Sequence, residues 1–572
     1  MHKAPTLLKT PMLAIAFAQG ICLYLLYRAF DNNTWPSESP LWFYPLLTLS
    51  VAVPVLLLLS MERDNTASVV KQVGIFGGVL ALLAIYTGWQ AEPFREFPVS
   101  SLSFAFSVSI ALACFKALMY LQQRANQVPL SYEVLFTYSW RNFLVAALSA
   151  LFVLIFWLIL MLWGQLFKVI DIDFFYELFT EEWFFIPVLS VAFGVGVIMF
   201  RALTRVIDTI TSLLHWLIKL LLPLIVTVAV IFLASLPFVG IDALWSTGNG
   251  TALLLWLLAI MLFFTNAVYQ DGREAAPYPP IIHRFIFIGL CAMPILSALS
   301  FYGLSLRVGQ YGWSVERCWA FVVWLVLTMF AVGYVVGIVR RRDQWTNDLA
   351  RVNTAMGLAI LAIMLLANSP LLDFRKISLD SQVRMVESGE KEWRAFDFYY
   401  ANRHLARPGY LAMQQLKQDI GDSDPELMAL IEKPVYRGLA ASTPSSDAMW
   451  EKMRYRPEPF DVPADLKPIV ERDSLTMRNM DLVMIRADLN DDGQAEYVLV
   501  SVYDYGIGQA PFFYRTEAGW QTGQLQHIGI QQGRGKTQEL IETGEITLVD
   551  PRFKDIDIGG VVLRPTFYDV GQ

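Results

Sequence analysis

The chain has 572 residues, of which 55% are hydrophobic and 17% charged, with a formal net charge of −7. Soluble domains carry about 25% charged residues, so this composition indicates a membrane protein and, lacking a basic excess, no nucleic-acid partner. The four cysteines form no CxxC pair and no cluster with histidine, which leaves neither a disulfide framework nor a zinc ligand set. Charged residues are sparse up to residue 373 and frequent beyond it. The sequence therefore predicts an α-helical membrane domain over 1–373 and a soluble tail.

Eleven apolar runs in the first part are long enough to cross a bilayer, which takes about 20 residues per helix. The first run is too long for a removable signal peptide and lacks a small-residue cleavage pattern, so we expect it to be retained. The predicted spans are 11–30, 41–60, 72–90, 102–122, 142–163, 184–203, 220–239, 252–270, 281–302, 318–339 and 353–372.

Basic residues near the ends of these spans predict the orientation of the chain. Up to residue 373 the chain has 21 lysines and arginines, and 16 of them fall on one side if the spans alternate. The other side holds only Arg28, Arg95, Lys168, Arg307 and Arg317. Because cytoplasmic loops are enriched in lysine and arginine, we expect a cytoplasmic N-terminus in a bacterial inner membrane. An odd number of spans then places the tail in the periplasm.

Two segments between spans have the pattern of surface helices. Residues 206–219, VIDTITSLLHWLIK, carry an apolar stripe and predict a helix along the cytoplasmic surface. Residues 168–185 mix five acidic residues with seven aromatic ones, and aromatic rings favour the membrane–water interface. This second segment predicts an anchoring helix on the outer surface; the alternative is the acidic rim of a binding pocket.

Three stretches resemble one family of bacterial membrane proteins, the domain of unknown function 4153. They are SWRNFLVAALSALFVLIFWLILMLWGQLFKVIDIDFF at 139–175, NAVYQDGREAAPYPP at 266–280, and the segment from LDSQVRMVESGEKEW to YLAMQQL at 379–416. The resemblance covers roughly 100–420 and follows the family's order. It implies a multipass inner-membrane protein with a short helical segment after the last span. It brings no activity, substrate or catalytic residue.

The predicted spans contain few groups that could serve transport or catalysis. Lys116 lies near the cytoplasmic end of its span and can extend to the interface, while Gln19 and Asn266 are candidates for interhelical hydrogen bonds. Asp31 lies in a short outer loop where a lipid-dependent transferase would need a carboxylate. The loop at 266–280 contains no nucleophile–base pair and predicts a structured turn.

The tail divides into three predicted parts: a helical segment over 374–435, an irregular linker over 436–470 and a β-rich domain over 471–572. The linker is rich in proline, serine and charge, and the last part shows short alternating runs bounded by Gly, Asp and Pro. The candidate strands are LVMIRA, EYVLVSVY, PFFYRTE, GWQTGQL, EITLVD and GGVVLRP.

The loop between the first two candidate strands, DLNDDGQAE, has the pattern of a calcium site. Asp488, Asn490 and Asp492 fall at positions 1, 3 and 5, a glycine follows, and the carbonyl of Gln494 and the carboxylate of Glu496 complete the predicted ligand set. Position 12 is a leucine rather than the glutamate of an EF-hand, and a strand follows. The loop therefore resembles the calcium loops of FG-GAP-type repeats; the alternative is an ion-free turn. A bound calcium ion would stabilise the fold rather than catalyse a reaction.

These observations favour a non-enzymatic inner-membrane protein that binds, senses or assembles with a partner in the cell envelope, in contact with membrane lipids. A transporter or lipid flippase is the first alternative, and a cavity lined by Gln19, Lys116 or Asn266 would support it. A lipid-dependent transferase is the second, and an outer cleft holding Asp31 and the acids of 171–182 would support it.

Overall fold

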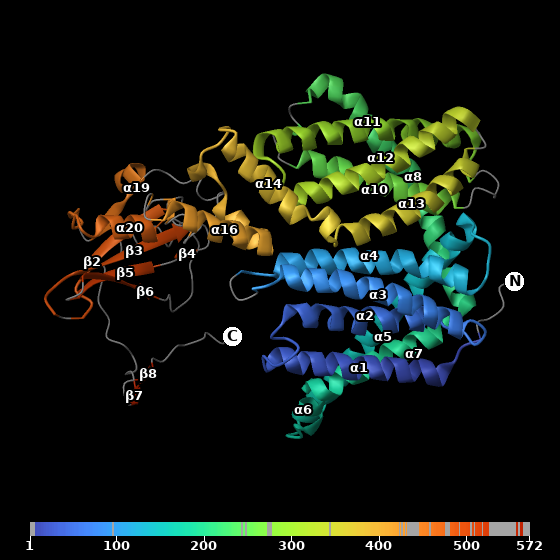
Figure 1. Ribbon diagram of the computed structural model, residues 1–572, viewed down its shortest axis with the longest axis horizontal. Coiled ribbons are helices and arrows are strands. Elements are labelled where there is room, and N and C mark those ends of the chain that lie inside the picture. The colour runs from blue at the N-terminus through green and yellow to red at the C-terminus, as the bar shows by residue number, and fades with distance from the viewer. Residues whose placement is uncertain are drawn as a thin grey trace. The chain divides into compact units, whose positions relative to one another are not determined.

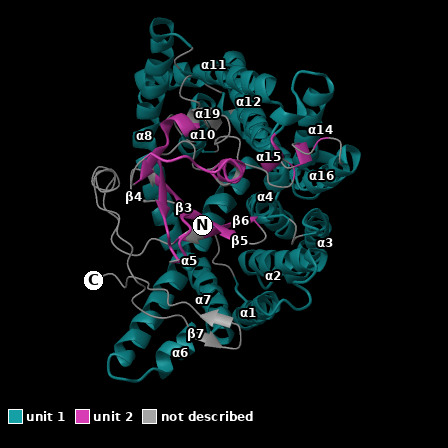
Figure 2. Cartoon of the chain, turned by 90° about the vertical axis from the view of Figure 1, so that its left-hand side faces the viewer, with its two compact units in different colours: residues 1–396, 400–423 teal, residues 397–399, 424–572 magenta. Residues whose placement is uncertain are grey.

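The computed structural model divides the chain into two compact units, which Figure 2 colours separately. Unit 1 comprises residues 1–396 and 400–423, and unit 2 comprises 397–399 and 424–572. The structure describes residues 6–93, 97–241, 244–245, 249–270, 277–341, 345–421, 424, 427–428, 431, 446–456, 459–474, 481–490, 492–503, 506–507, 510–516, 519–525, 556–558 and 561–563.

Unit 1 is a bundle of long apolar helices that run back and forth along a common direction (Figure 1). Eleven helices among the described residues are long and apolar enough to cross a membrane, which confirms the predicted helical membrane bundle. Most extend a few residues beyond the predicted runs because polar residues continue the helical turns outside the apolar core. They are α1 (Lys9–Asp31), α2 (Pro40–Ser60), α3 (Thr66–Gln90), α4 (Ser100–Ala125), α5 (Tyr132–Lys168), α7 (Glu182–Ala202), α8 (Thr204–Val239), α10 (Gly250–Tyr269), α11 (Pro280–Tyr311), α12 (Val315–Arg341) and α13 (Thr346–Leu366).

The bundle has two main packing centres. One is formed by buried side chains of the first helices, including Met12, Leu56 and Val197. The other lies among α8, α10, α11, α12 and α13 and includes Leu258 and Met293, both fully buried. Figure 1 shows the same division, with the blue helices α1–α4 on one side and the green and yellow helices α10–α13 on the other.

Alternating helix directions give unit 1 two ends. We call the end that holds the connections 61–65, 126–131 and 277–279 the basic end, since the basic loops of the sequence lie there. The end that holds the connections 32–39, 312–314 and 367–373 is called the opposite end.

Helix α8 differs from its prediction. The amphipathic segment 206–219 is not a separate surface helix but the first part of one uninterrupted helix of 36 residues. Pro223 lies inside this helix and cannot donate to the carbonyl four residues earlier. The Tyr278 hydroxyl donates to that carbonyl, Lys219 O, at 2.5 Å. A side chain from beyond α10 thus replaces the missing backbone hydrogen bond and allows the helix to continue.

The acidic and aromatic segment at 168–185 forms the short helix α6 (Phe174–Thr180), which folds back against the end of α5. Trp163 of α5 contacts Phe175 and Phe179, with ring centroids 5.2 and 5.7 Å apart. Gly164 permits this approach because a Cβ atom there would lie 3.0 Å from the backbone of Tyr176. The predicted helix is therefore present and held by aromatic packing at the opposite end.

After the last span the chain continues as η2 (Pro370–Leu372), α14 (Phe374–Glu387), η3 (Trp393–Ala395), α15 (Phe398–His404) and α16 (Ala406–Ile420). Helix α14 is joined to the turn before α12, since Ser381 Oγ accepts from Trp313 N at 3.0 Å and Ser378 Oγ donates to Trp313 O at 3.1 Å. The first part of the predicted helical segment 374–435 is thus packed into unit 1.

Unit 2 contains a mostly antiparallel sheet with strand order β1–β2–β3–β5–β6 and β4 beside β3. The strands are β1 (Arg454–Arg456), β2 (Asp481–Ala487), β3 (Glu496–Tyr503), β4 (Gly506–Ile507), β5 (Ala510–Thr516) and β6 (Gly519–Leu525), and a separate hairpin pairs β7 (Ile556–Ile558) with β8 (Val561–Leu563). The predicted candidates LVMIRA, EYVLVSVY, PFFYRTE and GWQTGQL correspond to β2, β3, β5 and β6. The candidate EITLVD lies outside the described residues.

Part of the predicted linker contributes to the core of unit 2. Helix α19 (Ser446–Lys452), strand β1 and the start of α20 (Lys467–Asp473) all come from 436–470. Met449 and Leu466 are buried against Met484 and Leu499 of the sheet. The sequence does not reveal these core positions because the apolar residues occur singly, among prolines and charged residues.

Candidate functional site

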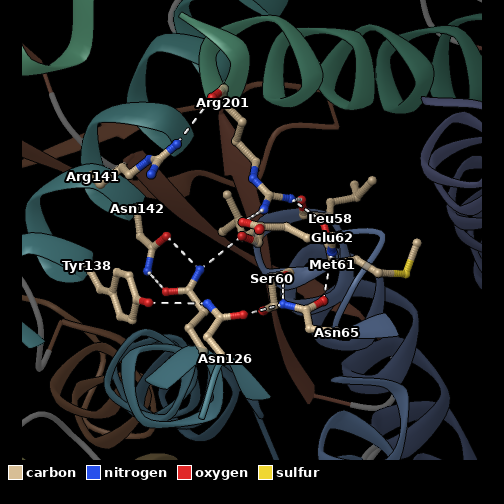
Figure 3. Close-up of polar contacts among 12 residues, drawn as sticks. Leu58, Ser60, Met61, Glu62, Asn65, Asn126, Tyr138, Arg141, Asn142 and Arg201 are labelled. Atoms are coloured by element: carbon tan, nitrogen blue, oxygen red, sulfur yellow. Dashed lines mark hydrogen bonds and ion pairs between the residues drawn. The ribbon is translucent and has the colours of Figure 1, made fainter. Parts of the chain in front are cut away.

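A network of buried polar side chains surrounds the last turn of α2 at the basic end (Figure 3). Arg201, on α7, is only 5% exposed, and its Nη1 donates to Leu58 O at 2.8 Å and Met61 O at 2.9 Å. Its Nη2 lies 3.2 Å from Glu62 Oε1. The last carbonyls of a helix have no partner within it and carry partial negative charge. A guanidinium at this position therefore both neutralises and satisfies the end of α2.

Amide side chains complete this network and connect three further segments. Gln122 of α4 donates to Leu59 O at 2.9 Å and exchanges two hydrogen bonds with Asn142 of α5. Asn65 donates to Asn126 at 2.7 Å, and Figure 3 marks this hydrogen bond between the two side chains. Because the amides bond to one another and to backbone, they leave few groups for a ligand, and the network serves to hold α2, α4, α5 and α7 together.

A second closed network lies inside the other half of the bundle. The Tyr334 hydroxyl is fully buried and lies 2.7 Å from Asn266 Oδ1 and 2.5 Å from Asn353 Oδ1. Asn353 Nδ2 donates to Asn266 Oδ1 at 2.6 Å. Asn266 is therefore an interhelical hydrogen-bond partner, which is one of the roles that the sequence suggests for it.

The basic end also contains a polar cavity of about 690 Å³. Its walls come from the starts of α5, α8 and α11, the end of α10 and the first residue of α13. Ligand pockets for small molecules have volumes of about 300–1,000 Å³, so this cavity has the size of a metabolite site. It is the candidate functional site of unit 1.

One wall of the cavity combines an imidazole with aromatic rings. His215 lies between Phe136, stacked at 5.6 Å, and Trp140, edge-on at 4.6 Å. Gln270 Nε2 lies 3.3 Å from His215 Nδ1, and because an amide nitrogen only donates, Nδ1 accepts and Nε2 carries the proton. Nε2 is buried and has no hydrogen-bond partner among the described residues. Because Nε2 lies below the surface of the cavity, a rotation of the imidazole on binding would bring this donor to a ligand acceptor.

The facing wall carries a second imidazole. The Tyr269 hydroxyl lies 2.9 Å from His283 Nδ1, and the Tyr269 ring packs edge-on against the fully buried Trp345 at 5.1 Å. His283 in turn packs against Phe287, with ring centroids 4.4 Å apart. These contacts fix the orientation of the tyrosine hydroxyl and of the imidazole at the cavity wall.

Charged and hydroxyl groups complete the lining. Arg141 and Lys219 contribute two positive charges and Asp208 one negative charge, while Thr211 and Ser212 add hydroxyl groups on the same helix as His215. The cavity can therefore hold a small molecule by hydrogen bonds, aromatic packing and attraction of an anionic group.

The residues that the sequence connects with transport do not meet in this cavity. Neither Gln19, Lys116 nor Asn266 lines it. At the opposite end, the Tyr27 hydroxyl donates to Glu182 at 3.2 Å, which brings the end of α1, near Asp31, to the start of α7. This exposed contact brings one acid of the predicted outer segment, Glu182, to a residue four positions before Asp31.

The predicted calcium ligands lie in the β2–β3 hairpin of unit 2. Asp488 accepts from the N–H groups of Asp492 and Gly493 at 3.2 and 2.9 Å, and Asn490 Oδ1 accepts from Asp492 N at 3.1 Å. Gly493 has φ +82°, a conformation that favours glycine. The side-chain oxygens of positions 1, 3 and 5 thus turn into one loop, as a calcium loop needs.

Two features of this hairpin differ from a preformed ion site. Glu496 is 4% exposed, and its Oε2 accepts from Leu489 N at 2.6 Å, so it closes the loop at the start of β3. Gln494 donates its N–H to Asp492 Oδ1 at 2.7 Å. Among the described residues, no three His, Cys, Asp or Glu side chains come together as a metal-binding group. Calcium binding stays a prediction.

The bundle, its interhelical polar networks and its appended sheet define a class, the multipass α-helical membrane proteins with a C-terminal soluble unit. Within this class, the model of the family described as a domain of unknown function, number 4153, matches residues 52–416, and the chain belongs to that family. No curated protein and no solved structure matches the chain. The family match ends before the hairpin loop, and no match supports its resemblance to FG-GAP repeats.

Sequence reasoning missed most of the cavity. Tyr269 and Gln270 belong to a stretch that predicts a turn, and His215 belongs to the predicted surface helix. The available signal was the high content of His, Tyr and Gln at the basic ends of neighbouring spans. Their convergence depends on helix packing, which no single segment encodes.

Proposed function

We propose that this chain is a non-enzymatic binding protein of the membrane, and that unit 1 takes up a small polar molecule in the cavity at its basic end. The observation that carries the proposal is the cavity itself, about 690 Å³ in volume, with the unused Nε2–H donor of His215 in its wall. Arg141 and Lys219 outnumber Asp208 there, which favours a ligand with an anionic group and several hydrogen-bond acceptors.

The remainder of unit 1 supports a scaffold role. The networks around Arg201 and Tyr334 join neighbouring helices, and Arg141, which donates to Arg201 O at 3.2 Å, connects the first of them to the cavity wall. Buried polar groups that satisfy one another specify a single arrangement of helices. A rigid bundle of this kind holds the cavity walls in place, as a binding site requires.

The basic loops support a bacterial inner-membrane location with the basic end toward the cytoplasm. In this orientation the cavity receives a cytoplasmic ligand, and the odd number of candidate spans supports a periplasmic position for unit 2. Unit 2 then offers a sheet for an envelope partner, with the β2–β3 loop stabilised by calcium through Asp488, Asn490 and Asp492. The chain would report on a cytoplasmic ligand to the envelope.

The two alternatives rest on other observations. Transport or lipid flipping is favoured by a second, apolar cavity of about 590 Å³ between α2 and α4. A lipid-dependent transferase is favoured by the approach of Glu182 to the end of α1. Neither alternative involves the imidazoles that line the polar cavity. Mutations in the polar cavity, in the apolar cavity and at Glu182 therefore test the three functions separately.

A matched pair of tryptophan substitutions tests the binding site. Ser212 and Thr209 are exposed hydroxyl residues on α8, but only Ser212 lines the cavity. Purified full-length protein in detergent is heated with each member of a panel of anionic metabolites, and the melting temperature is recorded. We expect at least one compound to raise the melting temperature of wild type and of Thr209→Trp, but not of Ser212→Trp.

His215→Ala is the second variant, because it removes the donor without filling the cavity. We expect it to lower the affinity for the same compound at least tenfold, as loss of a buried hydrogen bond does. Stabilisation of all three variants to the wild-type extent, or of none of the four proteins by any compound in the panel, would contradict the proposal.

A further inference from the structure

A second cavity, of about 590 Å³, runs along α2 and α4 and has almost entirely apolar walls. Along α2 its lining extends from Pro40 at the opposite end to Leu59 near the basic end. At about 1.5 Å per residue this length is about 28 Å, close to the ~30 Å thickness of a hydrocarbon core. We call this cavity the α2–α4 groove; its shape is that of a channel for a lipid chain.

The mouth of the groove at the opposite end is polar. Tyr44 of α2 and Ser103 of α4 both line it, and their hydroxyl oxygens lie 2.5 Å apart. Ser103 donates to Val99 O at 2.8 Å, so Tyr44 donates to Ser103 and keeps its oxygen as an acceptor. The apolar channel thus ends in hydroxyl groups at the level where lipid head groups begin.

Arg375 of α14 lies near this mouth: it is half-buried and interacts electrostatically with Tyr44, although it is not itself one of the residues that line the groove. Burial lowers the pKa of its guanidinium, and the nearby Asp373, Tyr86 and Tyr44 oppose that shift. Its Nε is buried without a hydrogen-bond partner, and its guanidinium donates to no acceptor within the described residues. A buried N–H donor without a partner is costly, and the charged group that carries it interacts electrostatically with Tyr44, which lines the groove.

A second arginine approaches the mouth from α16. Arg407 lies over the Trp89 ring at 4.7 Å and donates through Nη1 to Glu92 O at 3.1 Å. Its Nε is also buried without a hydrogen-bond partner among the described residues. Glu92 follows Ala91, which lines the groove, so Arg407 reaches the backbone beside the opening without being one of its lining residues.

Two carboxylates lie in the same region and limit the chemistry. Asp373 is 8% exposed, and its oxygens accept from the Tyr86 hydroxyl at 2.8 Å, from Gln90 Nε2 at 2.5 Å and from Arg375 N at 2.9 Å. Glu92 accepts from Ser39 Oγ at 3.4 Å. The two acids balance the two arginines in formal charge. The mouth would therefore recognise a ligand through direct hydrogen bonds from the guanidinium groups rather than through a net positive charge.

We propose that the α2–α4 groove binds a glycerophospholipid, with one acyl chain between α2 and α4 and its phosphodiester on the guanidinium of Arg375. Arginine donors match phosphate oxygens in geometry, and the apolar walls match the chain. This site is separate from the polar cavity at the basic end and does not depend on it. Since the phosphodiester is the recognised group, phosphatidylglycerol and phosphatidylethanolamine bind alike, and dioleoylglycerol, which lacks it, does not.

Native mass spectrometry of the purified full chain, released from detergent with added lipid, tests the proposal. The probes are dioleoyl phosphatidylglycerol, dioleoyl phosphatidylethanolamine and dioleoylglycerol. We expect wild type to retain one molecule of either phospholipid and no dioleoylglycerol. Arg375→Gln reduces retention at least tenfold, and Arg375→Lys restores part of it.

Matched variants separate binding from misfolding. Ala111 is exposed and lines the groove, whereas its neighbour Leu112 is exposed and does not, so only Ala111→Trp should expel the lipid. Arg384→Gln changes an exposed arginine on the same helix as Arg375 and should leave retention unchanged. Equal retention of dioleoylglycerol, or wild-type retention by both Arg375→Gln and Ala111→Trp, would overturn the proposal.

Discussion

The buried guanidinium of Arg201 provides the sharpest test of how unit 1 is held together. Substitution by methionine keeps an unbranched side chain but removes two hydrogen bonds, to Leu58 O and Met61 O, at 2.8 and 2.9 Å. Hydrogen bonds to charged groups contribute about 1.5–3 kcal/mol each. The ion pair with Glu62 adds little, because the Glu62 side chain is 30% exposed and solvent screens it.

The expected loss for Arg201→Met is about 3–5 kcal/mol in the free energy of unfolding, since burial of the charge itself has a cost that the methionine avoids. Urea unfolding in mild detergent, followed by circular dichroism at the helical band, measures this loss. Glu62→Gln should cost less than about 1 kcal/mol.

Arg205→Met is the control, because Arg205 is exposed one turn further along, in α8. It should unfold within about 0.5 kcal/mol of wild type, as exposed substitutions usually do. If Arg201→Met were as stable as Arg205→Met, the capping role of Arg201 at the end of α2 would be refuted.

Three further predictions concern separate contacts. Tyr278→Phe should lower the free energy of unfolding by about 1 kcal/mol, because it removes the donor to Lys219 O. This loss should vanish in the Pro223→Ala background, where the alanine N–H supplies the hydrogen bond. A double-mutant cycle of unfolding free energies measures the coupling, and equal losses in both backgrounds would contradict the reasoning. Gly88→Ala should lower the melting temperature because its Cβ would lie 2.3 Å from Pro40 O. Gly78→Ala, on the same helix but with open space around it, should not. Equal melting temperatures of the two variants would refute the close approach of α2 and α3. Unit 2 within the full chain should melt at a higher temperature in calcium than in the presence of a chelator. The double variant Asp488→Asn, Asp492→Asn should abolish this increase. A wild-type melting temperature that calcium does not change would show that the loop is an ion-free turn.

The sequence predicts the helices of unit 1 well because each span is a local property. An apolar run of bilayer length has few alternatives to a helix, so all eleven runs appear as long helices. The error at α8 has a long-range cause. The amphipathic stretch 206–219 and the apolar stretch 220–239 predict two separate elements, but Tyr278, 55 residues beyond Pro223, donates to the carbonyl that the proline leaves unpaired.

The sheet of unit 2 shows the same division between local and distant information. Alternating apolar residues predict β2 and β3, whose register pairs Asp481 with Val502 and Ala487 with Glu496. Strand β1 has only three residues and pairs in parallel with β2, so its pattern RYR gives no signal. Tertiary pairing rather than local propensity defines that strand.

The candidate site was the least predictable part. The lining of the polar cavity comes from five helices, and His215 and His283 are 68 positions apart in the sequence. The unused donor of His215 depends on the position of Gln270, which is a tertiary contact. The predicted loop ligands Asp488, Asn490 and Asp492 do share one turn because their spacing is local.

Cysteine labelling at Ser212 tests the central claim, a polar cavity open toward the cytoplasm, most directly. Ser212→Cys is made in a chain whose four native cysteines, at 22, 114, 291 and 318, are replaced by serine. A membrane-impermeant thiol reagent is then applied to spheroplasts and to inverted membrane vesicles. The account predicts labelling in inverted vesicles alone; labelling from the spheroplast side, or in neither preparation, would contradict it.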